Sequence, residues 1–466
     1  MPNTLEENVN RVKAAKTAIA NAITAKGGTV GANDGLEDFA SDIGTIPSGG
    51  GSAVEAKDVN FYDYDGTIVN SYTATEFANL STFPENPSHE GLTAQGWNWD
   101  TLANAKAYVA SYGKLDIGQM YKSNTSNGNT LLHIRLDEGR LKPYLGLTGN
   151  YNTASATIDW GDNSTPETVV LNKTTVYTPH EYSSKGDYVI TISAPDDALT
   201  LGGANGSNIF RKSDAANVNY DRVYQSILIK AEIGSTVKLG TFAFQNCTSL
   251  IEISLPDTIT TIPNNAFNNC YNLTSIAMPN SITTIENNAF SGCYSLKTIT
   301  ISSSITNIVS NSFSSTRYLR KILFPNKVFT IADNAFQYCY VAEQIILPNI
   351  ALSLAGNAFS NGSSLKSIII PNTITSIPYN FVSDCYLLTN ITIPSSVTQI
   401  GSNAFKNCYG LRYIKFEGTT PPTVSNSNAW SNIPTDCIIY VPSGSLSDYT
   451  SAQYYPDPNT YTYVEY

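Results

Sequence analysis

The chain has 466 residues, a length that suggests about three domains of ordinary size. It carries 38 Asp and Glu against 27 Lys and Arg, and the formal net charge of −11 argues against a nucleic-acid-binding surface. No apolar stretch approaches the length of a membrane-spanning helix, and only 14% of the residues are charged, so we expect a mainly β, multidomain protein without membrane insertion.

Residues 1–46 are predicted to form a helical module for attachment and oligomerisation. Residues 4–26 have a helical pattern that Thr4 caps and Gly27-Gly28 ends. The residues of its heptad seam are Leu5, Val9, Val12, Lys16, Ile19 and Ile23. Because fewer than three heptads are too short to be stable alone, we expect the seam to pack on copies of itself, as a trimer, or on a docking partner. The alternative is an amphipathic helix that packs within its own domain.

A second amphipathic piece follows this helix, and its apolar residues are Leu36, Phe39, Ile43 and Ile46. Together the two pieces resemble the short N-terminal module of phage tail and fibre proteins, and the resemblance implies attachment to a virion. Residues 47–56 then read as a flexible Gly/Ser linker. The N-terminus lacks the apolar region and cleavage site of a signal peptide, so export by the usual secretory route is not expected.

Residues 57–112 are expected to form a small β module that ends in a short helix over 101–112. A strand, an Asp-Gly turn, a second strand, two prolines and a closing Gly96-Trp97 resemble the β-grasp-like repeats of bacterial surface proteins. Asp63 and Asp65 have the spacing of a phosphatase-like pair. Since nothing else of such an active site is present, we assign both to a hairpin turn.

Residues 113–196 are predicted to form a β-sandwich. The runs of β character are Leu131–Leu136, Pro143–Leu147, Ala156–Trp160, Glu167–Leu171 and Tyr188–Ser193. The segments Ile158–Asp162 and His180–Ile190 resemble the sequence marks of a PKD-type sandwich, although Asn163 stands where the first mark ends in Gly. The resemblance implies that Trp160 lies in the core and that Tyr182 is a core or corner residue. Calcium at Asp159 and Asp162 is an alternative that we do not favour.

A loop-rich connector over 197–222 leads to residues 223–418, where one pattern recurs every 23 residues. One column is almost always Phe: Phe244, Phe267, Phe290, Phe313, Phe336, Phe359, Val382 and Phe405. Another is always Ile: Ile253, Ile276, Ile299, Ile322, Ile345, Ile368, Ile391 and Ile414. A fixed period of this length with an L-x-x-I-x-L strand indicates a leucine-rich-repeat solenoid, in which each turn buries its apolar residues against its neighbours.

The full motif, I-x-x-I-x-x-x-A-F-x-x-C-x-x-L-x-x-I-x-I-P, resembles the BspA-type leucine-rich repeats of bacterial surface and phage proteins. An Asn-Ala-Phe run recurs in five turns and is expected to be a tight turn with a buried Phe; it is found at Asn265–Phe267, Asn288–Phe290, Asn334–Phe336, Asn357–Phe359 and Asn403–Phe405. Residues 419–466 would close the array with a strand over Cys437–Pro442, a short helix at Leu446–Tyr449 and a last strand in Tyr454–Tyr466.

Six of the seven cysteines occupy a single repeat column, so the solenoid period sets their spacing. We predict an inward-facing stack of free thiols, with disulfides and a metal site as the alternatives weighed. The three histidines are scattered, and no nucleophile elbow, HExxH, P-loop or CxxC motif is present, so we expect no enzyme, no cofactor and no metal. A pair of carboxylates for glycoside hydrolysis remains a distant alternative, because such residues need not be close in sequence.

Outward strand positions vary freely, and one such column carries several basic residues. Residues 247–420 hold nine Lys and Arg and seven Asp and Glu, so they carry about +2 (9 − 7) and the rest of the chain about −13 (−11 − 2). The candidate glycan- or receptor-binding residues are Lys297, Arg320, Lys321, Lys366, Arg412, Tyr413 and Lys415. The alternative is a solvated face that discourages strand pairing with other chains.

These expectations combine into a non-enzymatic virion protein, a tail or head fibre or similar appendage that presents the solenoid to the host surface. Its N-terminal module would bind other virion proteins, and its solenoid would bind a host cell-surface glycan or protein. The alternative is a bacterial cell-surface adhesin of the BspA type.

Overall fold

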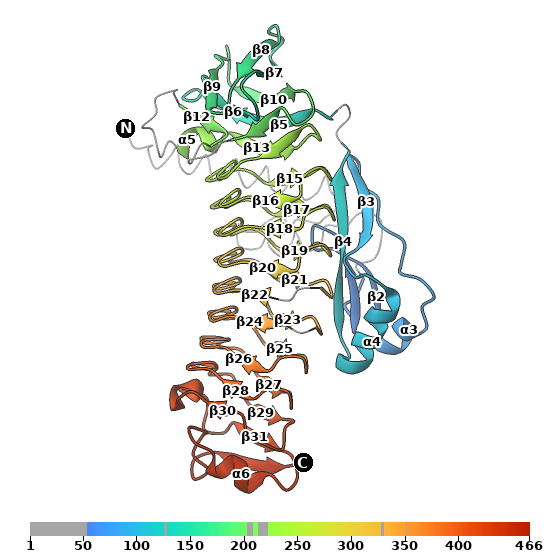
Figure 1. Cartoon of the computed structure of the whole chain (residues 1–466), viewed down its shortest axis with the longest axis vertical. Helices are drawn as coiled ribbons and strands as arrows, with labels where there is room; N and C mark the ends of the chain where they lie inside the picture. Colours follow the sequence, from blue (N-terminus) through green and yellow to red (C-terminus); the bar gives the residue numbers. More distant parts are fainter. Residues whose placement is uncertain (1–53, 125–127, 203–207, 213–221, 328–329, 351) are drawn as a thin grey trace, which may run out of the picture. The chain divides into compact units, whose positions relative to one another are not determined.

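The computed structural model describes residues 54–466 apart from 125–127, 203–207, 213–221, 328–329 and 351 (Figure 1). The chain divides into two compact units, residues 1–57 and residues 58–466. The helical module predicted over 1–46, its seam from Leu5 to Ile23 and its trimer all lie outside the described residues, as does most of the linker predicted over 47–56.

The second unit begins with a four-stranded sheet and two helices. These elements are β1 (Val59–Tyr62), β2 (Ile68–Tyr72), α3 (Ala74–Ala78), β3 (Leu92–Trp97), α4 (Leu102–Tyr112) and β4 (Leu115–Ser123). The strand order is β2-β1-β4-β3, with β1 and β4 parallel and the other two pairs antiparallel. β4 lies beyond residue 112, the expected end of this module, so we define the module as residues 58–123 and call it the brace module.

Local sequence explains the helices and the hairpin of the brace module. Thr73 and Glu76 form a capping box at the start of α3, and the Thr101 hydroxyl accepts a hydrogen bond from the Asn104 N–H at the start of α4. The helix predicted over 101–112 is therefore confirmed. The turn between β1 and β2 contains Gly66 at φ +92°, and Asp65 accepts from the Thr67 N–H, which confirms the hairpin turn.

Ten strands and one short helix follow. They are β5 (Thr130–Leu136), β6 (Tyr144–Gly149), β7 (Ala154–Asp159), β8 (Glu167–Leu171), β9 (Thr175–Pro179), β10 (Gly186–Ser193), β11 (Leu199–Leu201), β12 (Phe210–Arg211), α5 (Arg222–Gln225), β13 (Leu228–Glu232) and β14 (Val237–Leu239). The five runs of β character read from the sequence coincide with β5, β6, β7, β8 and β10. β11 and β12 lie in the segment 197–222 that was expected to be a loop-rich connector, and α5 begins at the last residue of that segment.

These strands form two sheets, and one of them continues into the repeats. The first sheet has the order β17-β15-β13-β5-β10-β7-β8, in which β15 (Glu252–Ser254) and β17 (Ser275–Ala277) belong to the first repeats. The second sheet has the order β12-β6-β11-β14, with β9 paired to β6. β13 pairs antiparallel with β5 and parallel with β15, so main-chain hydrogen bonds join the sandwich directly to the first repeat. Trp160 and Tyr182 are buried, as predicted, and the Tyr182 hydroxyl donates to the Trp160 carbonyl at 3.0 Å.

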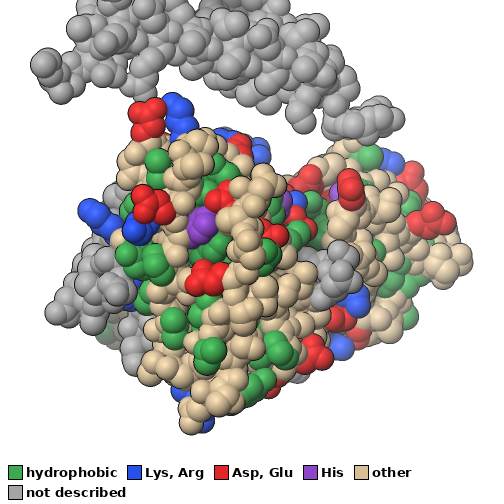
Figure 2. Space-filling model, turned by 90° about the horizontal axis from the view of Figure 1, so that it is seen from above, with side chains coloured by type: hydrophobic (Ala, Val, Ile, Leu, Met, Phe, Trp, Pro, Cys, Tyr) green, Lys and Arg blue, Asp and Glu red, His purple; other side chains and the backbone are tan. Residues whose placement is uncertain are grey.

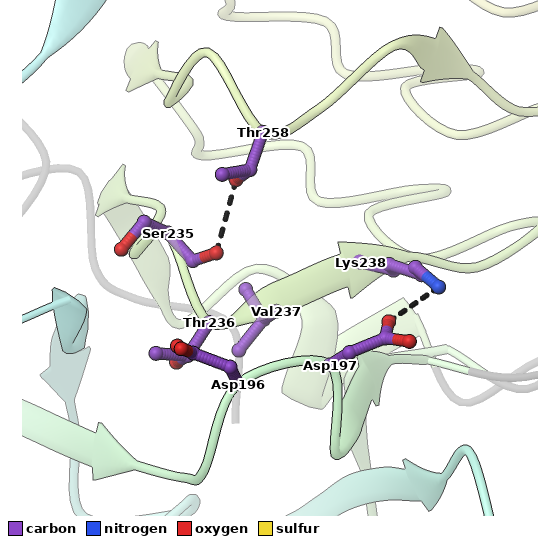
Figure 3. A pocket seen from close by; sticks show the side chains of 7 residues that line it. All are labelled: Asp196, Asp197, Ser235, Thr236, Val237, Lys238 and Thr258. Carbon is purple, nitrogen blue, oxygen red and sulfur yellow. Dashed lines mark hydrogen bonds and ion pairs between the residues drawn. The ribbon is translucent and has the colours of Figure 1, made fainter.

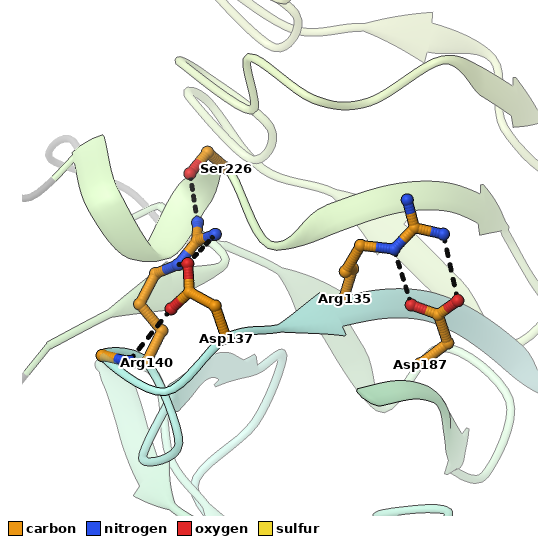
Figure 4. A network of polar contacts seen from close by, with 6 residues as sticks. Arg135, Asp137, Arg140, Asp187 and Ser226 are labelled. Carbon is orange, nitrogen blue, oxygen red and sulfur yellow. Dashed lines mark hydrogen bonds and ion pairs between the residues drawn. The ribbon is translucent and has the colours of Figure 1, made fainter. Parts of the chain in front are cut away.

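Two arginines form ion pairs on and beside the first sheet, as Figure 4 shows. Arg135 on β5 forms a two-point contact with Asp187 on β10, at 2.7 and 3.0 Å. Arg140 binds Asp137 at 2.8 Å and the Ser226 hydroxyl at 2.6 Å, which ties the loop after β5 to the residue that follows α5. Bidentate pairs of this kind add geometric definition, although exposed ion pairs contribute little free energy.

The repeats stack as a solenoid whose two walls are made of short parallel strands, confirming the 23-residue solenoid prediction (Figure 1). The longer strands are β15 (Glu252–Ser254), β17 (Ser275–Ala277), β19 (Thr298–Thr300), β21 (Lys321–Leu323), β23 (Gln344–Ile346), β25 (Ser367–Ile369), β27 (Asn390–Ile393), β29 (Tyr413–Phe416) and β31 (Ile438–Val441). Their outer side is the strand face. The opposite wall consists of β16 (Thr261–Ile262), β18 (Thr284–Ile285), β20 (Asn307–Ile308), β22 (Thr330–Ile331), β24 (Ser353–Leu354), β26 (Ser376–Ile377), β28 (Gln399–Ile400) and β30 (Thr423–Val424).

The turn of each repeat needs left-handed backbone, and the sequence supplies residues that tolerate it. Asn occupies one positive-φ column at Asn265, Asn288, Asn311, Asn334, Asn357, Asn380 and Asn403. Asn reaches this conformation more readily than most residues because its short amide bonds locally. The following Phe residues are buried, and Phe267 stacks on Phe290 with ring centroids 5.1 Å apart. The tight turn with a buried Phe is therefore confirmed.

The cysteine column is a stack of buried free thiols, as predicted. The Cys270 thiol donates to the Phe244 carbonyl of the preceding turn at 3.1 Å, and Cys293 donates to the Phe267 carbonyl at the same distance. Burial raises the pKa of each of these thiols above the usual range, which keeps them protonated and able to donate. Each of these two thiols therefore adds one hydrogen bond between its own turn and the turn before it.

The C-terminal end closes the solenoid with a strand, two short helices and a final strand. The short 3₁₀ helix Ser427–Trp430 precedes β31, and α6 (Leu446–Ser451) and β32 (Thr462–Glu465) follow it. β32 pairs parallel with β31, so the last strand expected in the Tyr-rich tail is present. Trp430 stacks on Phe405 at 5.0 Å and thereby covers the last turn.

The brace module is docked on the strand face of the solenoid. The Asn98 amide donates to the Ile301 and Leu323 carbonyls at 3.3 and 2.9 Å, and the Tyr108 hydroxyl donates to the Leu347 carbonyl at 2.7 Å. β4 packs across β17, β19 and β21, as Figure 1 shows. A methyl group on Gly118 would collide with the side chains of Thr300 and Leu323, which lie in the third and fourth turns counted from β15. Only glycine therefore allows this approach.

Candidate functional site

The basic column predicted from the sequence lies at the start of the long strands. Lys297, Arg320, Lys366 and Arg412 each stand one residue before a strand, and all four side chains are exposed. The Arg320 N–H donates to the Lys297 carbonyl at 2.8 Å, and the Arg412 N–H donates to the Thr389 carbonyl at 2.8 Å. This pairing keeps the column in register with a step of about 4.8 Å from turn to turn.

Lys321 is 27% exposed and lines the edge of the groove described below, but the brace module holds its charged group. Its ammonium pairs with Asp116 of the brace module at 2.6 Å, and it lies 5.3 Å from the centre of the Tyr62 ring. Burial lowers the pKa of Lys321, but Asp116 and Tyr62 together outweigh burial and raise it. Lys321 therefore attaches the brace module to the fourth turn, and we assign it a structural contact instead of ligand binding.

A groove opens beside the remaining basic residues. Its volume is about 560 Å³, and its walls include Arg320, Val341, Glu343, Ser364 and Lys366. Lys366 pairs with Glu343 at 2.8 Å, and both side chains are more than half exposed. The hydrogen bond from Lys366 lowers the pKa of Glu343, so this pair stays charged at neutral pH. Such an exposed pair exchanges readily with a charged ligand, because it contributes little free energy itself.

The last predicted residues lie near the C-terminal cap. Tyr413 is 37% exposed and contacts Tyr440 edge to face, with centroids 5.8 Å apart. The Lys415 ammonium lies 4.2 Å from the centre of the Tyr466 ring and is half-buried. Lys415 thus packs on the C-terminal residue, while Tyr413 remains available to a ligand together with Arg412.

Sequence reasoning missed a second column, which follows the cysteine column by one residue. Its members are Tyr271, Tyr294, Arg317, Tyr340, Ser363, Tyr386 and Tyr409. The signal was present in the sequence, because these positions repeat with the same 23-residue period. The backbone of this segment is also in register, since the Tyr318 N–H donates to the Tyr294 carbonyl and the Ser364 N–H to the Tyr340 carbonyl.

The tyrosine column has two parts with different geometry. In the first part the rings cover one another: Tyr271 and Tyr294 stack at 4.7 Å, and the Arg317 guanidinium lies 4.5 Å from the Tyr294 ring centre. In the second part Tyr386 and Tyr409 are tilted by 32° with centroids 5.7 Å apart, and they are 44% and 56% exposed. The second part therefore leaves ring surface open to solvent.

Each histidine of the chain contacts a carboxylate of its own. The pairs are His89–Asp63 at 2.6 Å, His133–Glu232 at 3.0 Å and His180–Asp162 at 2.8 Å. Burial raises the pKa of Asp162, but hydrogen bonds from Ser164 and His180 outweigh it and lower the value to about 2. Seen from the sandwich end, Figure 2 shows Asp and Glu interspersed with Lys and Arg. The contacts of the three histidines are hydrogen bonds that hold the structure together.

A second cavity, of about 380 Å³, lies where the sandwich meets the first repeat (Figure 3). Lys238 pairs with Asp197 there, and the Thr258 hydroxyl donates to the Ser235 carbonyl at 3.0 Å. These contacts join the second sheet to the repeats, so the cavity is a junction between structural elements. It lies away from the basic column.

Within residues 54–466, apart from the short gaps, no group of three or more metal-ligating side chains comes together. In the same part of the chain, no helix has both the length and the apolar character needed to cross a membrane.

The comparisons with known proteins identify the repeats. Residues 217–342 and 330–444 match the family model described as BspA type leucine rich repeat region. The matched residues, 217–444, are thus similar to BspA-type repeats and make up just under half of the chain. No curated protein matches the chain.

Solved structures of other leucine-rich-repeat proteins are similar to this one. A protein from Bacteroides ovatus shares 23% identity over 56% of this chain and 68% of that chain, with a TM-score of 0.41. A cell surface protein from Faecalibacterium prausnitzii shares 23% over 49% and 82%, with a TM-score of 0.24. The leucine rich repeat protein of T. pallidum shares 24% over 39% and 78%, with a TM-score of 0.29.

Proposed function

We propose that this chain is a non-enzymatic surface-binding protein, an adhesin whose BspA-type repeats recognise a ligand on the strand face. The observation that carries the proposal is the partial cover of that face. The brace module buries the outer positions Ser275, Thr298 and Thr300 of the early turns, whereas Arg320, Lys366 and the residues beyond them stay open. A face that is half covered by the chain itself and half open is suited to a ligand at its open end.

The charge of the open end favours an anionic ligand. Arg320, Lys366 and Arg412 stand in one register on a chain with a net charge of −11, so they form a local attractive region on a repulsive background. Such a region attracts anionic cell-surface polymers and raises the rate at which they meet the protein. Salt screens this attraction and weakens it.

The test is adhesion of purified protein to bacterial cells or envelopes. Reversing the charge at Arg320, Lys366 and Arg412 to Glu should abolish adhesion that is salt-sensitive in the wild type. The matched control reverses Lys114, Lys173 and Lys212, which are exposed elsewhere and give the same change of net charge. Unchanged adhesion by a folded triple variant would leave the basic column as solvated surface that discourages strand pairing.

A second setting for the same binding face is a phage virion, and the sequence of residues 1–46 favours it. The resemblance of that segment to phage fibre modules supports attachment to a particle, whereas the BspA-type repeats support a bacterial cell surface. Mass spectrometry of purified virions and of washed cell envelopes distinguishes the two, because the protein would be enriched in one fraction only. A variant that starts at Ser52 would fail to join the particle, and would lose oligomeric mass, if residues 1–46 attach and assemble it.

A further inference from the structure

We infer that the open end of the strand face binds an extended anionic polysaccharide, with Tyr386 and Tyr409 as the ring platform and the basic column as its charged side. This inference rests on the proposed surface-binding function and adds the residues and the ligand class. Tyr386 and Tyr409 are 44% and 56% exposed, although each directly follows a buried cysteine.

The exposed rings form a patch with their neighbours. Leu387, 49% exposed, follows Tyr386, and Arg412 and Tyr413 follow Tyr409 by three and four residues. Tyr386 and Tyr409 lie beside one another with ring centroids 5.7 Å apart, so together they present a larger ring surface than a single exposed tyrosine does. Sugar rings place C–H groups against aromatic faces and hydroxyls toward charged groups, and this patch offers both kinds of contact.

The groove continues the patch along the stack. It is lined by Arg320, Val341, Glu343, Ser364 and Lys366, and Ser363 and Ser364 are small residues at the turn between Tyr340 and Tyr386. From the turn of Arg320 to the turn of Arg412 there are four steps, or roughly 20 Å at about 4.8 Å a step. That length accommodates several sugar units of an extended chain, with positive charge at both ends.

The main chain argues against a peptide added as a strand. β25 pairs with β23 and β29 pairs with both β27 and β31, so the backbone groups of these strands are used within the solenoid. A strand-adding peptide needs a free sheet edge, and a face offers none. A polymer recognised by ring surfaces and charges fits the face better, and the basic residues select one that carries carboxylate or phosphate groups.

The experiment measures binding of the full chain to three polymers: a polyuronate, a teichoic acid and neutral dextran. The test variant is Tyr386→Ala with Tyr409→Ala, and the control is Tyr379→Ala with Tyr454→Ala, two tyrosines that are 45% and 42% exposed outside this column. Wild type and control should bind an anionic polymer and leave dextran unbound. The test variant should bind about tenfold more weakly, while its binding keeps the same dependence on salt.

A second variant, Ser363→Tyr, adds a ring to the same column and should strengthen binding of the same polymer. Binding of the polyuronate but not the teichoic acid assigns the carboxylate source, and the reverse assigns the phosphate source. If the wild type adheres to cells but binds none of the polymers, the polysaccharide inference is wrong and a protein ligand is indicated. If the test variant binds the polymers as the wild type does, the two tyrosines are not the ring platform and the inference is also wrong. If the wild type adheres to neither cells nor polymers, the proposed function itself fails.

Discussion

The contact between Lys321 and Asp116 should hold the brace module on the solenoid, and its contribution can be measured by a double-mutant cycle. The Asp116 side chain is 9% exposed, and besides Lys321 it accepts a hydrogen bond from the Asn60 amide at 3.1 Å. Lys321→Met would leave this carboxylate buried with neutral donors alone, the Asn60 amide and the Tyr62 hydroxyl. The cost is about 2–3 kcal/mol, because Lys321 itself is 27% exposed and partly screened.

Asp116→Asn should cost about 1–2 kcal/mol, since the freed ammonium of Lys321 can reach water. The double variant should cost less than the sum of the two, by about 1–2 kcal/mol. The matched control is the exposed pair Lys366 and Glu343, for which the coupling should stay below about 0.5 kcal/mol.

The assay is hydrogen exchange of β4 amides, followed by mass spectrometry of peptides that cover Leu115–Ser123. Exchange reports the free energy of local opening and does not require the whole chain to unfold in one step. A coupling as small as that of the control pair would refute the reasoning, because the salt bridge would then be a surface contact without energetic weight.

Three further predictions concern single positions. Cys293→Ala should lower the free energy of unfolding by about 1–3 kcal/mol. Cys293→Thr should cost less, because Thr316 already occupies the same column with its hydroxyl bonded to the Phe313 carbonyl at 2.7 Å. Denaturation series compare the two variants, and equal losses would contradict the hydrogen-bond explanation. Asn288→Ala should destabilise by about 1 kcal/mol, since φ is +57°, while Asn288→Gly should be nearly neutral in the same series. The pKa of Asp162 is about 2 in the folded protein against an ordinary 3.8, so its stabilising contribution is complete above pH 4 and is lost as the pH falls toward 2. Asp162→Asn should flatten acid unfolding over that range, and an unchanged acid limb would show that the carboxylate is not engaged.

The repeats were predictable because their physics is periodic. Every turn buries the same columns, so Ile253 and its equivalents recur unchanged, and the strand positions follow from counting. The strands of the sandwich were also found, since β8 has the bounds Glu167–Leu171 that the sequence indicated. By contrast, β11 and β12 have three and two residues and lie among polar loops, where such short strands leave no pattern. The families of the N-terminal modules, and the module over 1–46, stay predictions.

The docking of the brace module on the solenoid could not be predicted from the sequence. It depends on single contacts such as Asn98 with the Leu323 carbonyl, and a carbonyl partner places no demand on residue type. Lys321 therefore looked like any other member of an outward strand column, although its partner is Asp116. The tyrosine column was periodic and readable, but its openness at Tyr386 and Tyr409 depends on how neighbouring rings stack, which the spacing does not determine.

A linear array of turns normally opens from its ends, because each turn contacts only the next. The brace module changes this rule by touching turns that are not neighbours: its residues bond the Leu255 carbonyl in the first turn and the Leu347 carbonyl in the fifth. Those turns must therefore open together, as one cooperative block. The last contact of the brace module along the array is that of the Tyr112 hydroxyl, which donates to the Asn372 amide oxygen at 2.9 Å. The turns beyond it carry the exposed tyrosines, and we expect them to open separately from that block. The proposed polymer would therefore meet the part of the array that can adjust its curvature to follow it.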